Sequence, residues 1–199
     1  LEFRTLGFSS EFAATQDTTE VNVALNNGGI TVPKMAASAL SQDLSGSLDL
    51  TVDNWKYATS FTTAANGGNS VQYVYFLSAL TGAPTMDGLL VEIYEGATEP
   101  TGSPVSTTTT GAPPYGAGFA ELNAEFDPPA ILAPATKYWV SIGYVNPTYV
   151  DGSNYAAFLS VGVAGKSYNG TSWENNNSPE LFVQDYDTTS VVSIGNGKR

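Results

Sequence analysis

Two loops carry the side chains best suited to chemistry in this sequence. One loop holds Tyr149, Asp151 and Asn154, and the other holds Tyr168 and Trp173. Aromatic rings offer flat surfaces for sugar rings, and neighbouring Asn and Asp side chains can hydrogen-bond sugar hydroxyl groups. This mixture predicts a glycan-binding site. The alternative is that Trp173 packs over a sheet edge and the tyrosines simply complete a polar β-surface.

Carboxylates offer a second kind of chemistry. Glycoside hydrolysis needs two carboxyl groups and no histidine. The candidates are Glu92, Glu95, Glu121 and Glu125, and alternation along the predicted strands turns Glu92, Glu121 and Glu125 outward. Solvation of a strand face explains these outward residues, and no pattern gathers two of them in a cleft. We therefore expect no catalytic residues and no enzymatic activity.

Metal and nucleophile chemistry is restricted by composition. The chain has no Cys and no His, which removes thiol catalysis, Ser–His nucleophiles and the usual zinc ligands. Asp127, Asp151, Asp185 and Asp187 stand near predicted strand ends, where carboxylates and backbone carbonyls can bind calcium. No D-x-D-x-D-G loop is present. We expect no cofactor, and a structural calcium ion is the alternative.

Charge narrows the range of partners. The formal net charge is −12, and the seven Lys and Arg residues are scattered along 199 residues. Phosphate binding needs clustered cations, so we expect no nucleic-acid partner.

No apolar run reaches the roughly 18 residues of a membrane span, so we expect no membrane insertion. With 42% hydrophobic residues, the chain can bury one core of ordinary size.

The elements that would position these residues are β-strands. Apolar residues alternate in 89–96, 119–126 and 137–144, and further strands are predicted at 70–80, 155–163, 181–186 and 191–194. Prolines in 127–136 predict a connection outside the sheet. About eight short strands separated by turns predict an all-β antiparallel sandwich of the jelly-roll type.

One short helix is predicted upstream of these strands. Pro33 suits a first helical turn, and apolar residues follow at helical spacing. Such a helix is marginal alone in water, so we expect its apolar face to be an assembly contact. The residues of this contact are Ile30, Met35, Ala36, Ala39, Leu40 and Leu44.

The chain therefore divides into three expected parts. Residues 1–53 form an N-terminal arm with a strand and the short helix, for attachment and oligomerisation. Residues 54–187 form the sandwich, and residues 188–199 form a C-terminal edge strand and tail.

The order of segments resembles a known family. "FTTAANGGNSVQYVYFLSALTGAP" is followed by "LLVEIYEG", "TGSPV", "LAPATKYWVSI" and "SYNGTSWENNNSPELFVQDY". From Trp55 to Tyr186 this order is similar to extracellular jelly-roll modules, in which "YWV" precedes a late "GTSW" and a closing strand. Such modules occur in bacterial cell-surface proteins and in bacteriophage structural proteins.

The segment before the strands resembles a phage element. "GGITVPKMAASAL" is similar to a short stretch of tail-fibre and other virion proteins, with the form G-x-I-T-x-x-K-[LM]-A-x-x-A-[LV]. The resemblance implies a non-enzymatic bacteriophage structural protein, a tail-fibre or capsid-decoration component of the virion. Its implied partners are other virion subunits, further copies of itself (a trimer among the options) and a host-surface glycan. A secreted bacterial carbohydrate-binding or adhesin domain is the alternative.

Overall fold

The computed structural model describes residues 46–63, 69–116, 118–179, 181–185 and 191–194, and their regular elements are all β-strands. The strands are β1 (Gly46–Leu50), β2 (Lys56–Thr62), β3 (Asn69–Thr81), β4 (Gly88–Glu95), β5 (Thr101–Thr110), β6 (Ala120–Leu132), β7 (Lys137–Val145), β8 (Tyr155–Tyr168), β9 (Trp173–Pro179), β10 (Leu181–Asp185) and β11 (Val191–Ile194). The predicted all-β class is confirmed. The expected helix, its contact residues from Ile30 to Leu44, and Asp187 lie outside the described residues.

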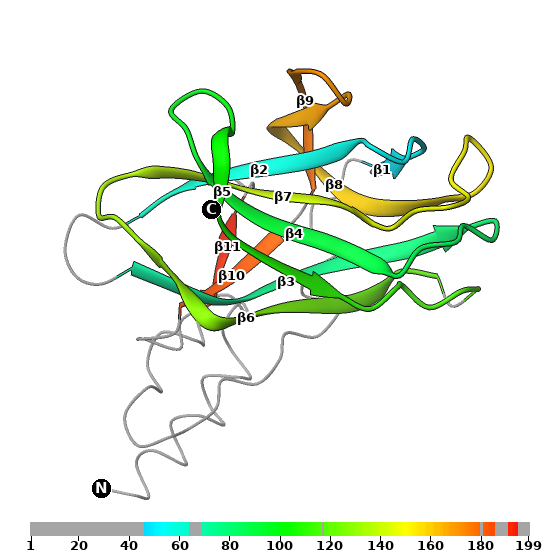
Figure 1. Cartoon of the computed structure of the whole chain (residues 1–199), viewed down its shortest axis with the longest axis horizontal. Coiled ribbons are helices and arrows are strands. Elements are labelled where there is room, and N and C mark those ends of the chain that lie inside the picture. Colours follow the sequence, from blue (N-terminus) through cyan, green and yellow to red (C-terminus); the bar gives the residue numbers. More distant parts are fainter. Residues whose placement is uncertain (1–45, 64–68, 117, 180, 186–190, 195–199) are drawn as a thin grey trace, which may run out of the picture.

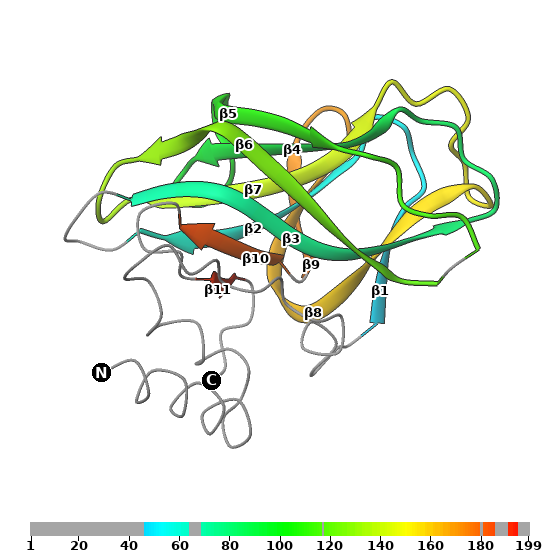
Figure 2. The same ribbon diagram turned by 90° about the horizontal axis from the view of Figure 1, so that it is seen from below.

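The strands pair antiparallel in two layers, as the predicted sandwich requires. The β7 layer runs β5-β4-β7-β2 and continues into the second half of β8 and then β9. The β3 layer contains β6, β3, β10 and β11, together with the first half of β8 and β1. The layers are continuous through β8, which Figure 2 shows curving from one to the other, while Figure 1 shows β4 and β7 above β3 and β6.

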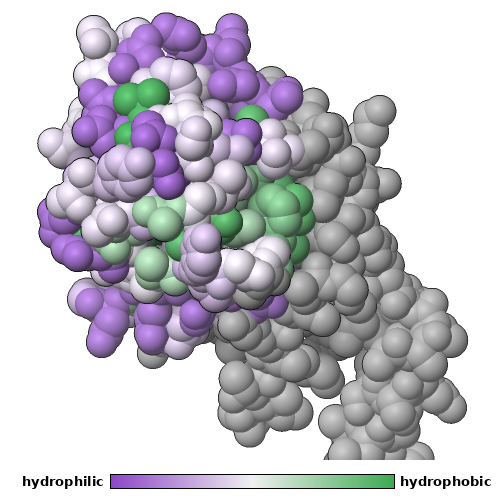
Figure 3. All heavy atoms as spheres, turned by 90° about the vertical axis from the view of Figure 1, so that its right-hand side faces the viewer, coloured by the Kyte–Doolittle hydropathy of each residue, from purple (hydrophilic) through white to green (hydrophobic). Residues whose placement is uncertain are grey.

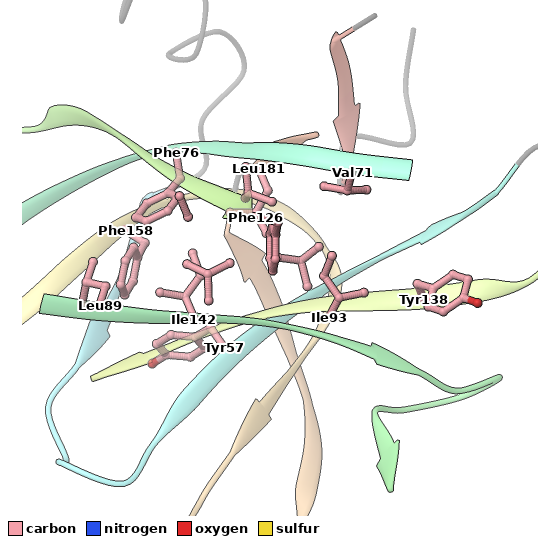
Figure 4. Close-up of a cluster of buried hydrophobic side chains, with 14 of the residues drawn as sticks. Tyr57, Val71, Phe76, Leu89, Ile93, Phe126, Tyr138, Ile142, Phe158 and Leu181 are labelled. Atoms are coloured by element: carbon pink, nitrogen blue, oxygen red, sulfur yellow. The ribbon is translucent and has the colours of Figure 1, made fainter. Parts of the chain in front are cut away.

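Alternation along the strands fills the space between the layers. On β7, Tyr138, Val140, Ile142 and Tyr144 face inward and are buried, as their spacing predicts. Figure 4 shows side chains of the β7 layer meeting those of the β3 layer, among them Phe76. Each fully buried side chain of this kind contributes about 1.5–3 kcal/mol to folding.

Strand β1 belongs to the sandwich, although it lies in the segment expected to be an arm. It pairs with β8, and its Leu48 and Leu50 join the core. Two buried tyrosines hold it: the Tyr57 hydroxyl donates to the Asp49 carbonyl at 3.0 Å, and the Tyr144 hydroxyl donates to the Leu50 carbonyl. The sandwich of the described residues therefore begins at β1.

The expectation that residues 127–136 lie outside the sheet is wrong for its first part. Strand β6 continues through Pro128 and Pro129 to Leu132. The prolines are tolerated because, among the described strands, β6 pairs with β3 alone, and the ladder is interrupted between the partners of Val71 and Tyr73. Proline cannot donate to a ladder, but no ladder bond is required at such an irregularity on an edge strand.

Candidate functional site

The five residues predicted to bind a glycan do not form one site. Tyr149, Asp151 and Asn154 lie in the loop between β7 and β8, whereas Tyr168 and Trp173 flank the turn between β8 and β9. Figure 1 shows the first loop at one end of the sandwich and the β8–β9 hairpin projecting from the top. The two loops distinguished in the sequence therefore lie at two separate places in the fold.

In the first loop, the polar side chains build the loop itself. The Asp151 carboxylate accepts hydrogen bonds from the Ser153 amide at 2.7 Å, the Asn154 amide at 2.9 Å and Asn154 Nδ2 at 3.0 Å. These bonds, first that of Ser153, lower the pKa of Asp151 below its usual value. Asn154 Oδ1 accepts from the Ala83 amide at 2.9 Å. The ring of Tyr149 is 53% exposed and is accessible to a ligand.

This end of the sandwich is closed by apolar residues. Leu80, Met86 and Val150 are partly buried and pack against the core. Figure 3 shows this end, with hydrophobic surface in the middle of the face and hydrophilic residues above and below it. The position of these side chains is explained by closure of the core.

At the second place, aromatic rings cluster on the outer face of the β7 layer. The rings of Tyr168 and Trp173 lie 5.2 Å apart between centroids and are tilted by 48°. Trp173 also contacts the Tyr94 ring edge-on at 6.3 Å. Tyr168 and Trp173 are partly exposed, while Tyr94 is 8% exposed beneath them. The buried Tyr94 therefore supports Trp173, which in turn contacts Tyr168.

The register of the strands brings this cluster together. Tyr168 stands opposite both Lys56 on β2 and Trp173 on β9. Directly opposed residues of an antiparallel pair share a face of the sheet. The three side chains therefore point outward side by side, although Lys56 is far from the other two in the sequence.

A lysine–glutamate pair lies next to the rings. Lys56 Nζ donates to Glu92 Oε2 at 2.6 Å and to the Tyr94 hydroxyl at 3.5 Å, and Ser141 Oγ donates to Glu92 Oε2 at 3.3 Å. The stem of Lys56 crosses β7 at Gly143, where a Cβ atom would lie 3.0 Å from Lys56 Cγ. Burial, and then the charge of Glu92, raise the pKa of Tyr94.

The β4–β5 loop folds over the same face. Two contacts hold this loop: Trp139 Nε1 donates to the Gly96 carbonyl at 2.8 Å, and Lys166 pairs with Glu99 at 3.7 Å. Lys137 Nζ lies 4.7 Å from the centroid of the Trp139 ring. Trp139 is therefore only 3% exposed although it points away from the main core. With Ala58 and Tyr94 it forms a second small core, against which Trp173 packs.

The carboxylates considered for hydrolysis lie on different layers. Glu92 is on β4 of the β7 layer, whereas Glu121 and Glu125 are on β6 of the β3 layer. Glu92 points outward as alternation predicts, yet it is buried in the polar cluster with Lys56. The Glu125 carboxylate accepts a hydrogen bond from the Tyr73 hydroxyl at 2.8 Å, which raises the pKa of Tyr73.

The described residues contain neither a metal-binding cluster of carboxylates nor a helix that could span a membrane. No group of three or more Asp and Glu side chains in this part of the chain is arranged to hold a metal ion. None of its elements is a helix long and apolar enough to cross a membrane.

Alternation predicts the outward direction of Tyr94 and Glu92, but it cannot reveal their partners. Nothing in the sequence around Lys56 predicts its contact with Glu92, because that contact depends on the strand register and on the lack of a side chain at Gly143.

In the comparisons with known proteins, no family model matches this chain, and the curated proteins contain no significant match.

Proposed function

We propose that this chain is a non-enzymatic structural protein of a bacteriophage particle, a tail-fibre or capsid-decoration component whose sandwich faces outward and binds glycans of the host surface. The observation that carries the binding part is the pair of accessible rings, Tyr168 and Trp173, supported by the buried Tyr94. The virion part is supported by the resemblance of residues 28–40 to a short element of virion proteins.

The ring pair suits a sugar because it is preorganised. Tyr168 and Trp173 are held by strand pairing, and Trp173 packs on the second small core, so little side-chain freedom is lost on binding. Exposed amide side chains follow on β9 at Asn175, Asn176 and Asn177. Stacking on the rings and hydrogen bonds from such amides are the usual means of holding a sugar.

The proposed protein is attached to the virion through its N-terminal segment. In the proposed protein, residues 1–45 attach the sandwich to other virion subunits and to further copies of the chain, with Ile30 and Leu40 in the contact. The finer topology of the sandwich is that of a jelly roll. The location is the virion, outside the host cell.

Glycan-array binding tests the binding part. We expect Trp173→Ala to abolish binding to any glycan that the unchanged protein retains, because the larger ring of the pair is lost. Tyr115→Ala is the matched control, since that ring is 70% exposed and lies outside both predicted loops. Unchanged binding by the Trp173→Ala variant, or no binding by the unchanged protein, would contradict glycan binding by this ring pair.

A secreted bacterial carbohydrate-binding or adhesin domain is the second candidate, because the ring pair would serve it equally well. Antibody labelling in the electron microscope separates the two. Labelled phage particles support the virion assignment, whereas label confined to bacterial cell surfaces supports the alternative.

A further inference from the structure

All three cationic side chains of the described residues lie on one face. Lys56 stands opposite Tyr168, and Lys166 stands opposite Ala58, which belongs to the second small core. Lys137 lies over the ring of Trp139, two residues further along β7. We call this outer surface of the β7 layer the lysine–aromatic face. It combines accessible rings with ammonium groups in a chain whose net charge is −12.

The other described surfaces offer an anion no such partner. The β3 layer carries Glu125 and Asp127 on β6, and the loop end carries Asp87 and Asp151. Within the described residues, therefore, ammonium groups are offered to an anionic ligand by the lysine–aromatic face alone, where Glu92 and Glu99 are their present partners. Local concentration of charge of this kind steers ligands and sets selectivity.

The three lysines differ in how far they are neutralised. Lys56 is held tightly by Glu92 at 2.6 Å. Lys137 forms no ion pair within the described part of the chain. Lys166 is paired only loosely, since Glu99 lies 3.7 Å away on the β4–β5 loop and its side chain is 44% exposed. The Lys166 side chain is itself 13% exposed, so Glu99 is the more accessible partner, and a partly exposed pair at this distance contributes little to stability.

Lys166 is also the lysine placed to serve the ring pair. It precedes Tyr168 by two residues on β8, so both side chains are on the same face, and it stands opposite Asn175, two residues after Trp173. Glu99 shows that a carboxylate can reach its ammonium group.

We propose that the lysine–aromatic face selects acidic sugars: a sugar ring stacks on Trp173 and Tyr168, and its carboxylate replaces Glu99 at Lys166. This inference rests on the proposed function and names the class of glycan. No covalent step is involved. All ligands of this class contain a negatively charged sugar unit, and uronic acids are the simplest probes for it.

Calorimetry with oligogalacturonate and its methyl-esterified form tests the inference, because the ester keeps the sugar rings and replaces each carboxylate by an uncharged methyl ester. We expect the acid form to bind about ten-fold more tightly in 50 mM salt. The advantage should shrink at 300 mM salt, since screening weakens exposed charge pairs.

Two variants test the role of the Lys166–Glu99 pair directly. Lys166→Gln should remove the advantage of the acid form and leave binding of the ester unchanged. Glu99→Gln should raise affinity for the acid form several-fold, because the competing carboxylate is gone, again without effect on the ester. A merely structural Lys166–Glu99 pair would instead make both variants weaken both probes alike.

The outcomes separate this inference from the proposed function. Equal affinity for acid and ester, or array binding confined to neutral glycans, would overturn the selection of acidic sugars and leave glycan binding intact. Absence of binding to every acidic and neutral glycan would overturn both.

Discussion

Lys56 reaches Glu92 across a neighbouring strand because β7 has no side chain at Gly143. The lysine stem occupies the space that a Cβ atom would fill, with only 3.0 Å between that atom and Lys56 Cγ. Glu92 is buried, and it accepts hydrogen bonds from Lys56 and Ser141. A buried carboxylate that loses its cation is left with an uncompensated charge, which is strongly destabilising.

This arrangement predicts that Gly143→Ala lowers stability. The added methyl group displaces the Lys56 stem and weakens the Lys56–Glu92 pair, so we expect a loss of about 1–3 kcal/mol in the free energy of unfolding. Urea titration measures it. Gly152→Ala is the matched control, because no atom lies within 4 Å of a Cβ at that exposed position. Equal effects of the two changes would show that the Lys56 path has no energetic importance.

At the scale of elements, β1 shows how a short strand can be essential to the sandwich. It has five residues and β8 is its only partner among the described strands, yet Leu50 is fully buried and the hydroxyls of Tyr57 and Tyr144 bond to its carbonyls. The alternation of residues 47–52 predicts a strand. It does not predict that this strand completes the core instead of belonging to an arm.

We therefore expect Leu50→Ala to destabilise the sandwich by about 2–5 kcal/mol, the usual range for a large-to-small change in a core. Ile131→Ala removes a similar side chain from an outward position of β6 that is 78% exposed, and should change stability by less than about 0.5 kcal/mol. Thermal or urea unfolding of both variants measures the difference. A loss below about 1 kcal/mol for Leu50→Ala would mean that β1 is dispensable.

At the scale of the whole molecule, buried tyrosines join distant parts of the fold. Tyr144 on β7 donates to β1 and accepts from the Ala156 amide of β8 at 2.7 Å. Burial raises the pKa of Tyr144 above its ordinary value of 10 and raises the pKa of Tyr75 to about 12. The folded chain therefore keeps these protons at a pH where the unfolded chain releases them.

The contribution of these two phenols to the free energy of unfolding should therefore be constant below pH 10. It should fall as the pH rises toward about 12. Each such phenol removes at most about 1.4 kcal/mol per pH unit in this window. We expect Tyr144→Phe to be less stable at pH 8, because its hydrogen bonds are lost, and to show a shallower decline above pH 10. Urea unfolding at a series of pH values measures the slope, with the exposed Tyr115→Phe as control. Identical slopes in the two variants would contradict the role assigned to Tyr144.

The candidate site shows where prediction from sequence succeeds and fails. Tyr168 and Trp173 were recognisable as candidates, since aromatic residues beside Asn form a local pattern. Their separation from Tyr149, and their support by Tyr94, depend on which strands become neighbours. The wrong assignment of Pro128 and Pro129 has the same origin, because only the pairing of β6 shows that its ladder is interrupted there.

The sequence by itself determined the β-sandwich class, the inward face of β7 and the acidity of the molecule, because alternation and composition are properties of neighbouring residues and of simple counts. Tertiary structure alone decided that Lys56, Lys137 and Lys166 share one face with the rings of Tyr94, Tyr168 and Trp173. Register between distant strands is set by the packing of the whole core. No local pattern in the chain contains that information.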